Sequence, residues 1–79
     1  MKVLYFASAR TAAGLGEETW QTDTPLSLEM FWQEAIRRHP NLAPLRPSTR
    51  LARNADYLQP GELLHPNDEV ALIPPVSGG

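Results

Sequence analysis

Apolar residues near both ends of the chain follow a pattern that is typical of β-strands. A β-branched and aromatic run over Val3–Ala7 predicts a first strand, and a similar run over Glu69–Ile73 predicts the last one. Both runs are apolar at odd and at even positions, whereas a sheet covered on one side needs only one apolar face. We therefore expect both strands to carry apolar side chains on both faces of a sheet.

The middle of the chain has the spacing of an amphipathic helix. Apolar and aromatic side chains, with one histidine at the end, recur three and four residues apart over residues 28–39. Ser27 is a suitable N-cap residue, and Pro40 cannot continue a helix. The last turn holds two arginines, where the helix dipole favours cations. The sequence thus predicts one main helix between Ser27 and Pro40.

The remaining segments are shorter and their patterns are weaker. Two glycines within Ser8–Gly16 predict a loop, which joins the first strand to a weakly alternating second strand over Glu17–Thr22. Three prolines predict an irregular connection over residues 40–49. Beyond it we expect, in chain order, a strand over Arg50–Arg53, a turn over Asn54–Asp56, a brief edge strand at Tyr57–Leu58, and turns at Pro60–Gly61 and Pro66–Asp68.

Together these elements predict an α+β fold in which a mixed sheet curls around the one main helix. Strand parity separates side chains that face the helix from side chains that face away from it. The first group is Val3, Tyr5, Val70 and Leu72, and the second is Leu4, Phe6, Ala71 and Ile73. Two interpretations of the second group stay open. These side chains form a docking surface for a partner, or they belong to central strands that loops cover.

Composition narrows the classes of function. The 79 residues suffice for one domain, which we place at residues 1–75, with residues 76–79 as a flexible tail. The net charge of −2 and the scattered basic residues argue against a nucleic-acid surface. The chain has no cysteine, which suits the cytoplasm. The apolar run at Val3–Ala7 is shorter than the roughly 7–15 residues of an export signal, so we expect a cytoplasmic protein without a membrane span.

Candidate catalytic and metal-binding groups are few. The segment Gly14–Gly16 lacks the spacing and the lysine of a phosphate-binding loop. His39 and His65 stand far apart with no carboxylate at ligand spacing, so we expect no metal site. We interpret them as a helix C-terminal residue and a turn residue. Glu17 and Glu18 are interpreted as solvated surface charge.

The C-terminal segment is the most unusual feature of the chain. It reads Pro74-Pro75-Val76-Ser77-Gly78-Gly79. The prolines favour a stiff extended backbone that cannot continue a sheet ladder, and the two glycines that follow the short side chains have no Cβ. A carboxylate behind them can enter a narrow enzyme channel. We therefore interpret the terminal carboxylate of Gly79 as the reactive group.

The two ends of the chain resemble a known family. The run from Asn67 to Gly79 closely resembles the ending of the small subunits of molybdopterin synthase (the MoaD type), which are ubiquitin-like sulfur carriers. The opening Val3–Ala7, with Arg10 beyond it, is similar to that family's first strand and following loop. Tyr57 departs from the pattern, because an aliphatic residue is common at that position.

The resemblance implies a β-grasp fold and the role of a sulfur carrier. An ATP-dependent activating enzyme would adenylate Gly79, and a sulfur donor would displace AMP to leave a thiocarboxylate. The carrier would then dock on the large synthase subunit, within a heterotetramer, and donate sulfur to the pterin precursor of the molybdenum cofactor. The resemblance implies no bound cofactor and no metal. It assigns the tail to Val76, Ser77 and Gly78, and the partner-binding surface to Phe6, Tyr57, Ile73, Pro74 and Pro75.

Three other functions stay open at this point. A carrier that delivers sulfur to thiamine or to tRNA would share the fold and the Gly-Gly end. A protein modifier would use Gly79 to form isopeptide bonds with lysines of other proteins. A plain binding module would have an inert tail, which the slim extended terminus disfavours.

Overall fold

The computed structural model describes residues 1–75 of the chain. Within them, one sheet has the strand order β2–β1–β5–β3–β4. Strands β1 and β5 run parallel, and the other neighbours are antiparallel. The strands are β1 (Lys2–Tyr5), β2 (Glu17–Thr19), β3 (Arg50–Arg53), β4 (Asp56–Tyr57) and β5 (Glu69–Ile73), and the helices are α1 (Ala7–Ala13), α2 (Leu28–Arg38) and the 3₁₀ helix η1 (Pro40–Ser48).

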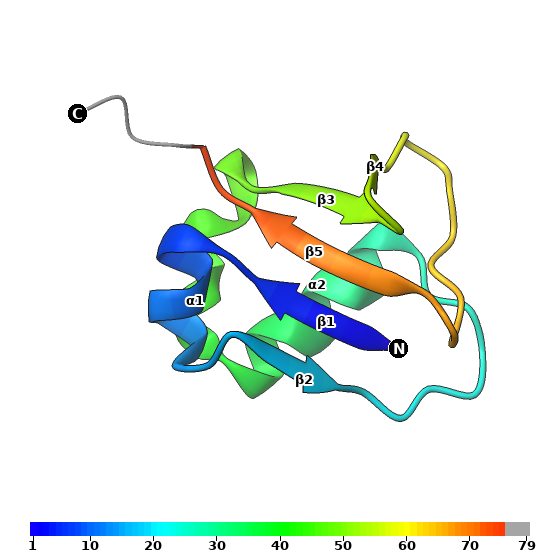
Figure 1. The fold of residues 1–79 in the computed structure, drawn as a ribbon, viewed down its shortest axis with the longest axis horizontal. Helices are drawn as coiled ribbons and strands as arrows, with labels where there is room; N and C mark the ends of the chain where they lie inside the picture. Colours follow the sequence, from blue (N-terminus) through cyan, green and yellow to red (C-terminus); the bar gives the residue numbers. More distant parts are fainter. Residues whose placement is uncertain (76–79) are drawn as a thin grey trace.

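The sheet forms one layer, and α2 lies behind it as a second layer (Figure 1). The predicted α+β fold, a mixed sheet around one main helix, is confirmed and has the β-grasp arrangement. Because β1 and β5 are parallel, their carboxyl ends lie at the same edge of the sheet (Figure 1). That edge is where α1 begins and where the chain leaves β5.

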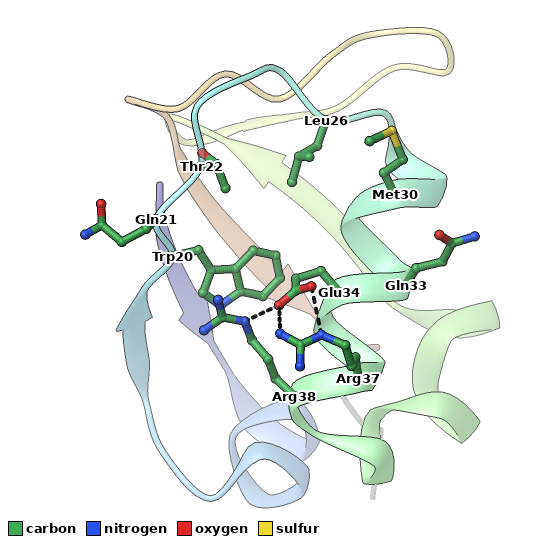
Figure 2. A pocket seen from close by; sticks show the side chains of 9 residues that line it. All are labelled: Trp20, Gln21, Thr22, Leu26, Met30, Gln33, Glu34, Arg37 and Arg38. Atoms are coloured by element: carbon green, nitrogen blue, oxygen red, sulfur yellow. Dashed lines mark hydrogen bonds and ion pairs between the residues drawn. The ribbon is translucent and has the colours of Figure 1, made fainter.

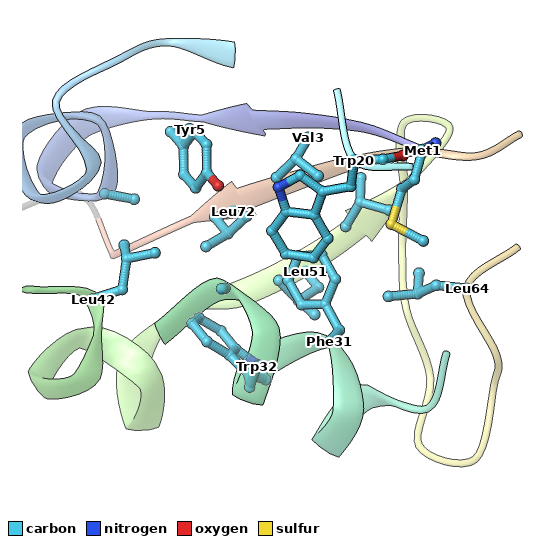
Figure 3. Close-up of a cluster of buried hydrophobic side chains, with 13 residues drawn as sticks. Met1, Val3, Tyr5, Trp20, Phe31, Trp32, Leu42, Leu51, Leu64 and Leu72 are labelled. Atoms are coloured by element: carbon cyan, nitrogen blue, oxygen red, sulfur yellow. Dashed lines mark hydrogen bonds between the residues drawn. The ribbon is translucent and has the colours of Figure 1, made fainter. Parts of the chain in front are cut away.

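Helix α2 forms as the sequence predicts. The Ser27 side chain accepts a hydrogen bond from the Met30 backbone N–H at 3.1 Å, which satisfies one of the orphan donors of the first turn. The buried stripe consists of Phe31, Trp32 and Ala35. These side chains pack against the sheet in one cluster (Figure 3), in which the Trp20 and Phe31 rings stack at 4.8 Å.

Strand parity is also confirmed. Val3, Tyr5, Val70 and Leu72 are each no more than 2% exposed and belong to the core (Figure 3). The alternate side chains point to the other face of the sheet, where Phe6 is 48% exposed. Strands β1 and β5 are central strands of the sheet, as the second interpretation required. In Figure 1, however, neither a helix nor a loop crosses the near face of these two strands, so the described residues do not cover it.

The predicted loop over Ser8–Gly16 is wrong, because Ala7–Ala13 is the helix α1. The glycine that suggested a loop ends this helix instead. Gly14 has φ +81°, the left-handed conformation in which many helices end. Its N–H donates to the Arg10 carbonyl and so satisfies an acceptor of the last turn. The first strand consequently stops at Tyr5 rather than at Ala7.

Other boundaries differ by a few residues. Strand β2 ends at Thr19 and not at Thr22, and the edge strand is Asp56–Tyr57 rather than Tyr57–Leu58. The connection predicted as irregular is a 3₁₀ helix, η1, which buries Leu42 completely. Strands β3 and β5 have the predicted bounds.

The helices within residues 1–75 are all too short or too polar to cross a membrane. The predicted tail, residues 76–79, lies outside the described residues.

Candidate functional site

Apolar side chains gather on the uncovered side of the sheet. We call this surface the open face and define it by Leu4, Phe6, Ala52, Tyr57, Ala71 and Ile73. The register of the strands brings these residues together. Ala71 on β5 is paired with Leu4 on β1 and with Ala52 on β3. Ala52 is in turn opposite Tyr57 on β4. The open face surrounds a hollow of about 320 Å³. Phe6 and Tyr57 are both 48% exposed there, so large aromatic surfaces are available to a partner.

The open face continues to the point where the chain leaves the sheet. The Phe6 N–H donates to the Leu72 carbonyl at 3.3 Å, which holds Phe6 beside the end of β5. Ile73 is the last residue of that strand. Of the two prolines that follow, Pro74 is buried and Pro75 is exposed. A partner on the open face therefore meets Phe6 and Ile73 at the edge where the chain leaves β5, whereas Pro74 is buried in the domain.

The resemblance assigned five partner-binding residues in distant segments, and the structure brings three of them, Phe6, Tyr57 and Ile73, to the open face. The other two directly follow β5, where Pro74 is buried and Pro75 is exposed. The expected reactive residue, Gly79, and the tail residues Val76, Ser77 and Gly78 lie outside the described residues.

Charged groups flank the open face at its two ends. Near the start of β1 and β5, the Lys2 ammonium lies 3.6 Å from a Glu17 carboxylate oxygen and 3.9 Å from one of Glu69. At the opposite end, the Arg50 guanidinium lies over the Tyr57 ring, 3.7 Å from its centroid. The sequence analysis did not single out Arg50. The sequence feature that could have identified Arg50 was its two-residue spacing from Ala52, because residues two apart in a strand lie on the same face of the sheet.

A larger hollow, of about 570 Å³, lies between α2 and the chain that follows β2 (Figure 2). Its cations are already paired, because Arg37 and Arg38 each lie 2.6 Å from Glu34 Oε2. These two arginines hold the pKa of Glu34 at about 2. The Thr22 hydroxyl also lines this hollow but forms no hydrogen bond with Glu34 or any other described residue, so the hollow does not show a nucleophile activated by an adjacent base.

Glu18 is not the solvated charge that the sequence suggested. Register places it opposite Val3 on the helix side of the sheet, and its side chain is 18% exposed. One oxygen, Oε1, accepts from the Tyr5 hydroxyl at 2.5 Å and the Trp20 indole N–H at 2.8 Å, and lies 2.9 Å from His39 Nε2. The sequence feature that could have indicated burial of Glu18 was its two-residue spacing from Trp20, because residues two apart in a strand lie on the same face of the sheet.

Competing effects set the protonation of this cluster. Burial raises the pKa of Glu18, but the hydrogen bonds from Trp20, Tyr5 and His39 outweigh burial and hold that pKa below its usual value. Burial, followed by the adjacent Glu18 carboxylate, raises the pKa of Tyr5. The tyrosine thus stays a neutral donor and Glu18 stays an anionic acceptor. The cluster joins β1, β2 and the end of α2, and we interpret it as structural.

No three potential metal-ligating side chains gather within residues 1–75. His39 is engaged with Glu18, whereas His65 is exposed beside the turn at Pro66–Asn67. The Asp68 carboxylate accepts from the His65 backbone N–H at 2.8 Å and closes that turn.

Comparison with known proteins agrees with this geometry. Residues 3–79 match the model of the ThiS family. The molybdopterin synthase sulfur carrier subunit of Chlamydomonas reinhardtii is 40% identical over 81 residues, covering 100% of this chain and 98% of that protein. The protein of the same name from Homo sapiens is 37% identical over 82 residues, covering 100% and 93%.

Among solved structures, SAMP1 from Haloferax volcanii superimposes with a TM-score of 0.83 at 26% identity, covering 100% of this chain and 98% of that one. Similarity in sequence and in backbone fold thus extends over the whole length of the chain. The chain belongs to the ThiS family.

Proposed function

We propose that this chain is the sulfur-carrier subunit of a molybdopterin synthase. The observation that carries the proposal is full-length similarity of 37–40% to two subunits of that name. The geometry agrees, because the open face ends where the chain leaves β5 towards Gly79. A partner that docks on this face receives the C-terminal segment at its own surface.

In the proposed cycle the reacting group is the terminal carboxylate of Gly79. A carboxylate is a poor electrophile, and an ATP-dependent activating enzyme converts it into an acyl adenylate with release of pyrophosphate. A sulfur donor then displaces AMP and leaves a thiocarboxylate. The thiocarboxylate sulfur then attacks the pterin precursor on the large synthase subunit. Water hydrolyses the resulting bond between the Gly79 carbonyl carbon and the sulfur, which leaves the sulfur on the precursor and restores the carboxylate.

This division of labour fits the described residues. Within residues 1–75 we find paired surface ions, a structural Glu18 cluster and an apolar open face, but no solvent-accessible hydroxyl with an adjacent base, since the Tyr5 hydroxyl that contacts Glu18 is buried. The catalytic acids and bases of the cycle are therefore proposed to belong to the activating enzyme and the large subunit. The absence of cysteine favours the cytoplasm as the compartment.

The test is the intact mass of the full chain after incubation with ATP, a cognate activating enzyme and a sulfur donor. We expect a gain equal to the replacement of one oxygen by sulfur, localised to Gly79. Addition of the large subunit and the pterin precursor should then return the carrier to its original mass and form molybdopterin. Sulfur transfer to a thiamine or tRNA precursor instead would assign the carrier to another pathway.

Deletion of Gly79 is the matched variant for this test. The residue lies beyond the described domain, so we expect an unchanged urea unfolding transition together with complete loss of adenylation. A truncated chain that still acquires sulfur would contradict the assignment of the reactive carboxylate.

A second candidate, a ubiquitin-like protein modifier, is favoured by one observation. The Haloferax volcanii protein with a TM-score of 0.83 is a small archaeal modifier protein. In that function the activated Gly79 would form isopeptide bonds with lysines of other proteins. Mass spectrometry of lysines bearing a C-terminal remnant of this chain would distinguish it from a carrier that returns unchanged.

A further inference from the structure

Arg50 occupies a defined place at the edge of the open face. It is paired with Ile73 across β3 and β5, and the side chain of the next residue, Leu51, is buried on the helix side. Arg50 therefore points to the same side of the sheet as Ile73 and Ala52. Its guanidinium lies over the Tyr57 ring at 3.7 Å, a distance typical of a cation–π interaction.

The cations near the open face differ in their partners. Lys2 contacts Glu17 and Glu69. Arg50 forms no ion pair with the acidic side chains within residues 1–75. The same holds for Arg10, but Arg10 lines a neighbouring hollow, whereas Arg50 lies directly over a ring of the open face. Stacking on Tyr57 fixes the orientation of the guanidinium while its N–H donors remain available.

A partner that covers Tyr57 and Ile73 must also cover Arg50. Removing a guanidinium from water without an anionic partner is costly, and the face of an aromatic ring compensates for part of that cost only. A carboxylate compensates best, because its two oxygens match the planar fork of the guanidinium. The position of Arg50 beside Ile73, the last residue of β5, then fixes the partner relative to the start of the tail.

We propose that the protein surface that docks on the open face is apolar and presents an aspartate or glutamate to Arg50 at the edge of Tyr57. This inference rests on the proposed function, since it takes the large synthase subunit as the docking protein. The apolar contacts supply affinity, and the Arg50–carboxylate pair fixes the orientation in which Gly79 enters the partner.

Binding of the full chain to the large subunit of the same genome, measured by isothermal titration calorimetry at low and high salt, tests the proposal. We expect Arg50→Met to weaken the affinity about 10-fold and Arg50→Glu about 100-fold, with a smaller dependence on salt than the original protein shows. Arg37→Glu is the matched control. It makes the same change in net charge on α2, behind the sheet, and should alter the affinity less than about twofold.

A charge exchange identifies the carboxylate. Each acidic residue on the docking surface of the large subunit is changed to arginine in turn, and one such change should restore binding of Arg50→Glu. Urea unfolding of each variant verifies the fold, because Arg50 is exposed and its replacement should leave stability nearly unchanged.

Three results would overturn the inference. Unchanged affinity of Arg50→Glu would refute the role of Arg50 while the proposed function stands. If the original chain fails to bind the large subunit at all, both the proposed function and the inference fall. If sedimentation shows a dimer of the chain that Arg50→Glu dissociates, the open face is covered by a second copy and not by a different protein.

Discussion

Replacement of Glu18 should destabilise the domain far more than replacement of its neighbour Glu17. Glu18 accepts from the Tyr5 hydroxyl and the Trp20 indole, whose side chains are 2% and 1% exposed. In Glu18→Ala both donors lose their partner, and a buried donor without one costs about 1–3 kcal/mol. Since Glu18 is itself 18% exposed, water can reach part of the vacated space.

We therefore expect Glu18→Ala to lower the free energy of unfolding by about 2–4 kcal/mol. A domain of this size has a total stability of about 4–12 kcal/mol, so this loss is a large fraction. It corresponds to a decrease in Tm of about 8–32 °C, at about 4–8 °C per kcal/mol. Glu18→Gln keeps one acceptor oxygen without the charge and should lose about 1–2 kcal/mol.

The pH dependence gives an independent test. The pKa of Glu18 is lower in the folded than in the unfolded state, where it is about 4.3. The ionised carboxylate thus contributes stability that is fully present above about pH 4.3 and is lost as the pH falls through the lower, folded value. The difference in stability between the original protein and Glu18→Gln should shrink over that interval. Comparing the two proteins removes the parallel contribution of Glu34, whose pKa is about 2.

Urea unfolding followed by tryptophan fluorescence measures these differences, because Trp20 and Trp32 are both buried. Glu17→Ala serves as the control, since Glu17 is 64% exposed and contacts Lys2 at 3.6 Å. It should lose less than about 1 kcal/mol. Equal effects of the two substitutions, or a Glu18→Gln difference that persists unchanged in acid, would refute the role assigned to this cluster.

Two further predictions concern the faces and turns of the sheet. Leu72→Ala should lower the free energy of unfolding in urea by about 2–5 kcal/mol, because Leu72 is 0% exposed. Ile73→Asp should mainly weaken binding of the large subunit in calorimetry. Loss of cooperative unfolding in Ile73→Asp would contradict the assigned faces. Ala55 has φ +75°, and Gly14 has φ +81° with open space where a Cβ would lie. Thermal unfolding should therefore show Ala55→Gly stabilised and Gly14→Ala destabilised, each by about 1 kcal/mol, and the opposite signs would refute the backbone argument.

The elements predicted best were those in which several local signals point to the same structure. Strand β5 has the predicted bounds, since Glu69–Ile73 follows turn residues and precedes two prolines. Helix α2 combines an N-cap, a buried stripe and a terminating proline. In both cases the local sequence signals agree with the tertiary environment, and parity then separated the core from the open face.

The errors arose where tertiary contacts decide the structure. Helix α1 is seven residues long, has Phe6 as an N-cap without a side-chain hydrogen bond, and buries Ala9. Small alanines give no apolar stripe, so the local signal was the pair of glycines. Glu18 was misplaced for a related reason, because a carboxylate is buried only where donors such as Tyr5 and Trp20 surround it. Trp20 is only two residues from Glu18, but Tyr5 comes beside Glu18 through the pairing of β1 with β2. The sequence alone does not determine the register of that pairing.

The parallel pairing of β1 with β5 links stability to function in this domain. Alternation along β5 puts Val70 and Leu72 in the core and leaves Ala71 and Ile73 on the open face. A shift of this pairing by one residue would exchange the two faces, and it would also move the point where the chain leaves the sheet. The core thus fixes the register, and the register fixes the position of the end of β5 relative to Phe6. A substitution that shifts this register without unfolding the domain should therefore impair the proposed sulfur transfer, because it displaces the end of β5 from the open face.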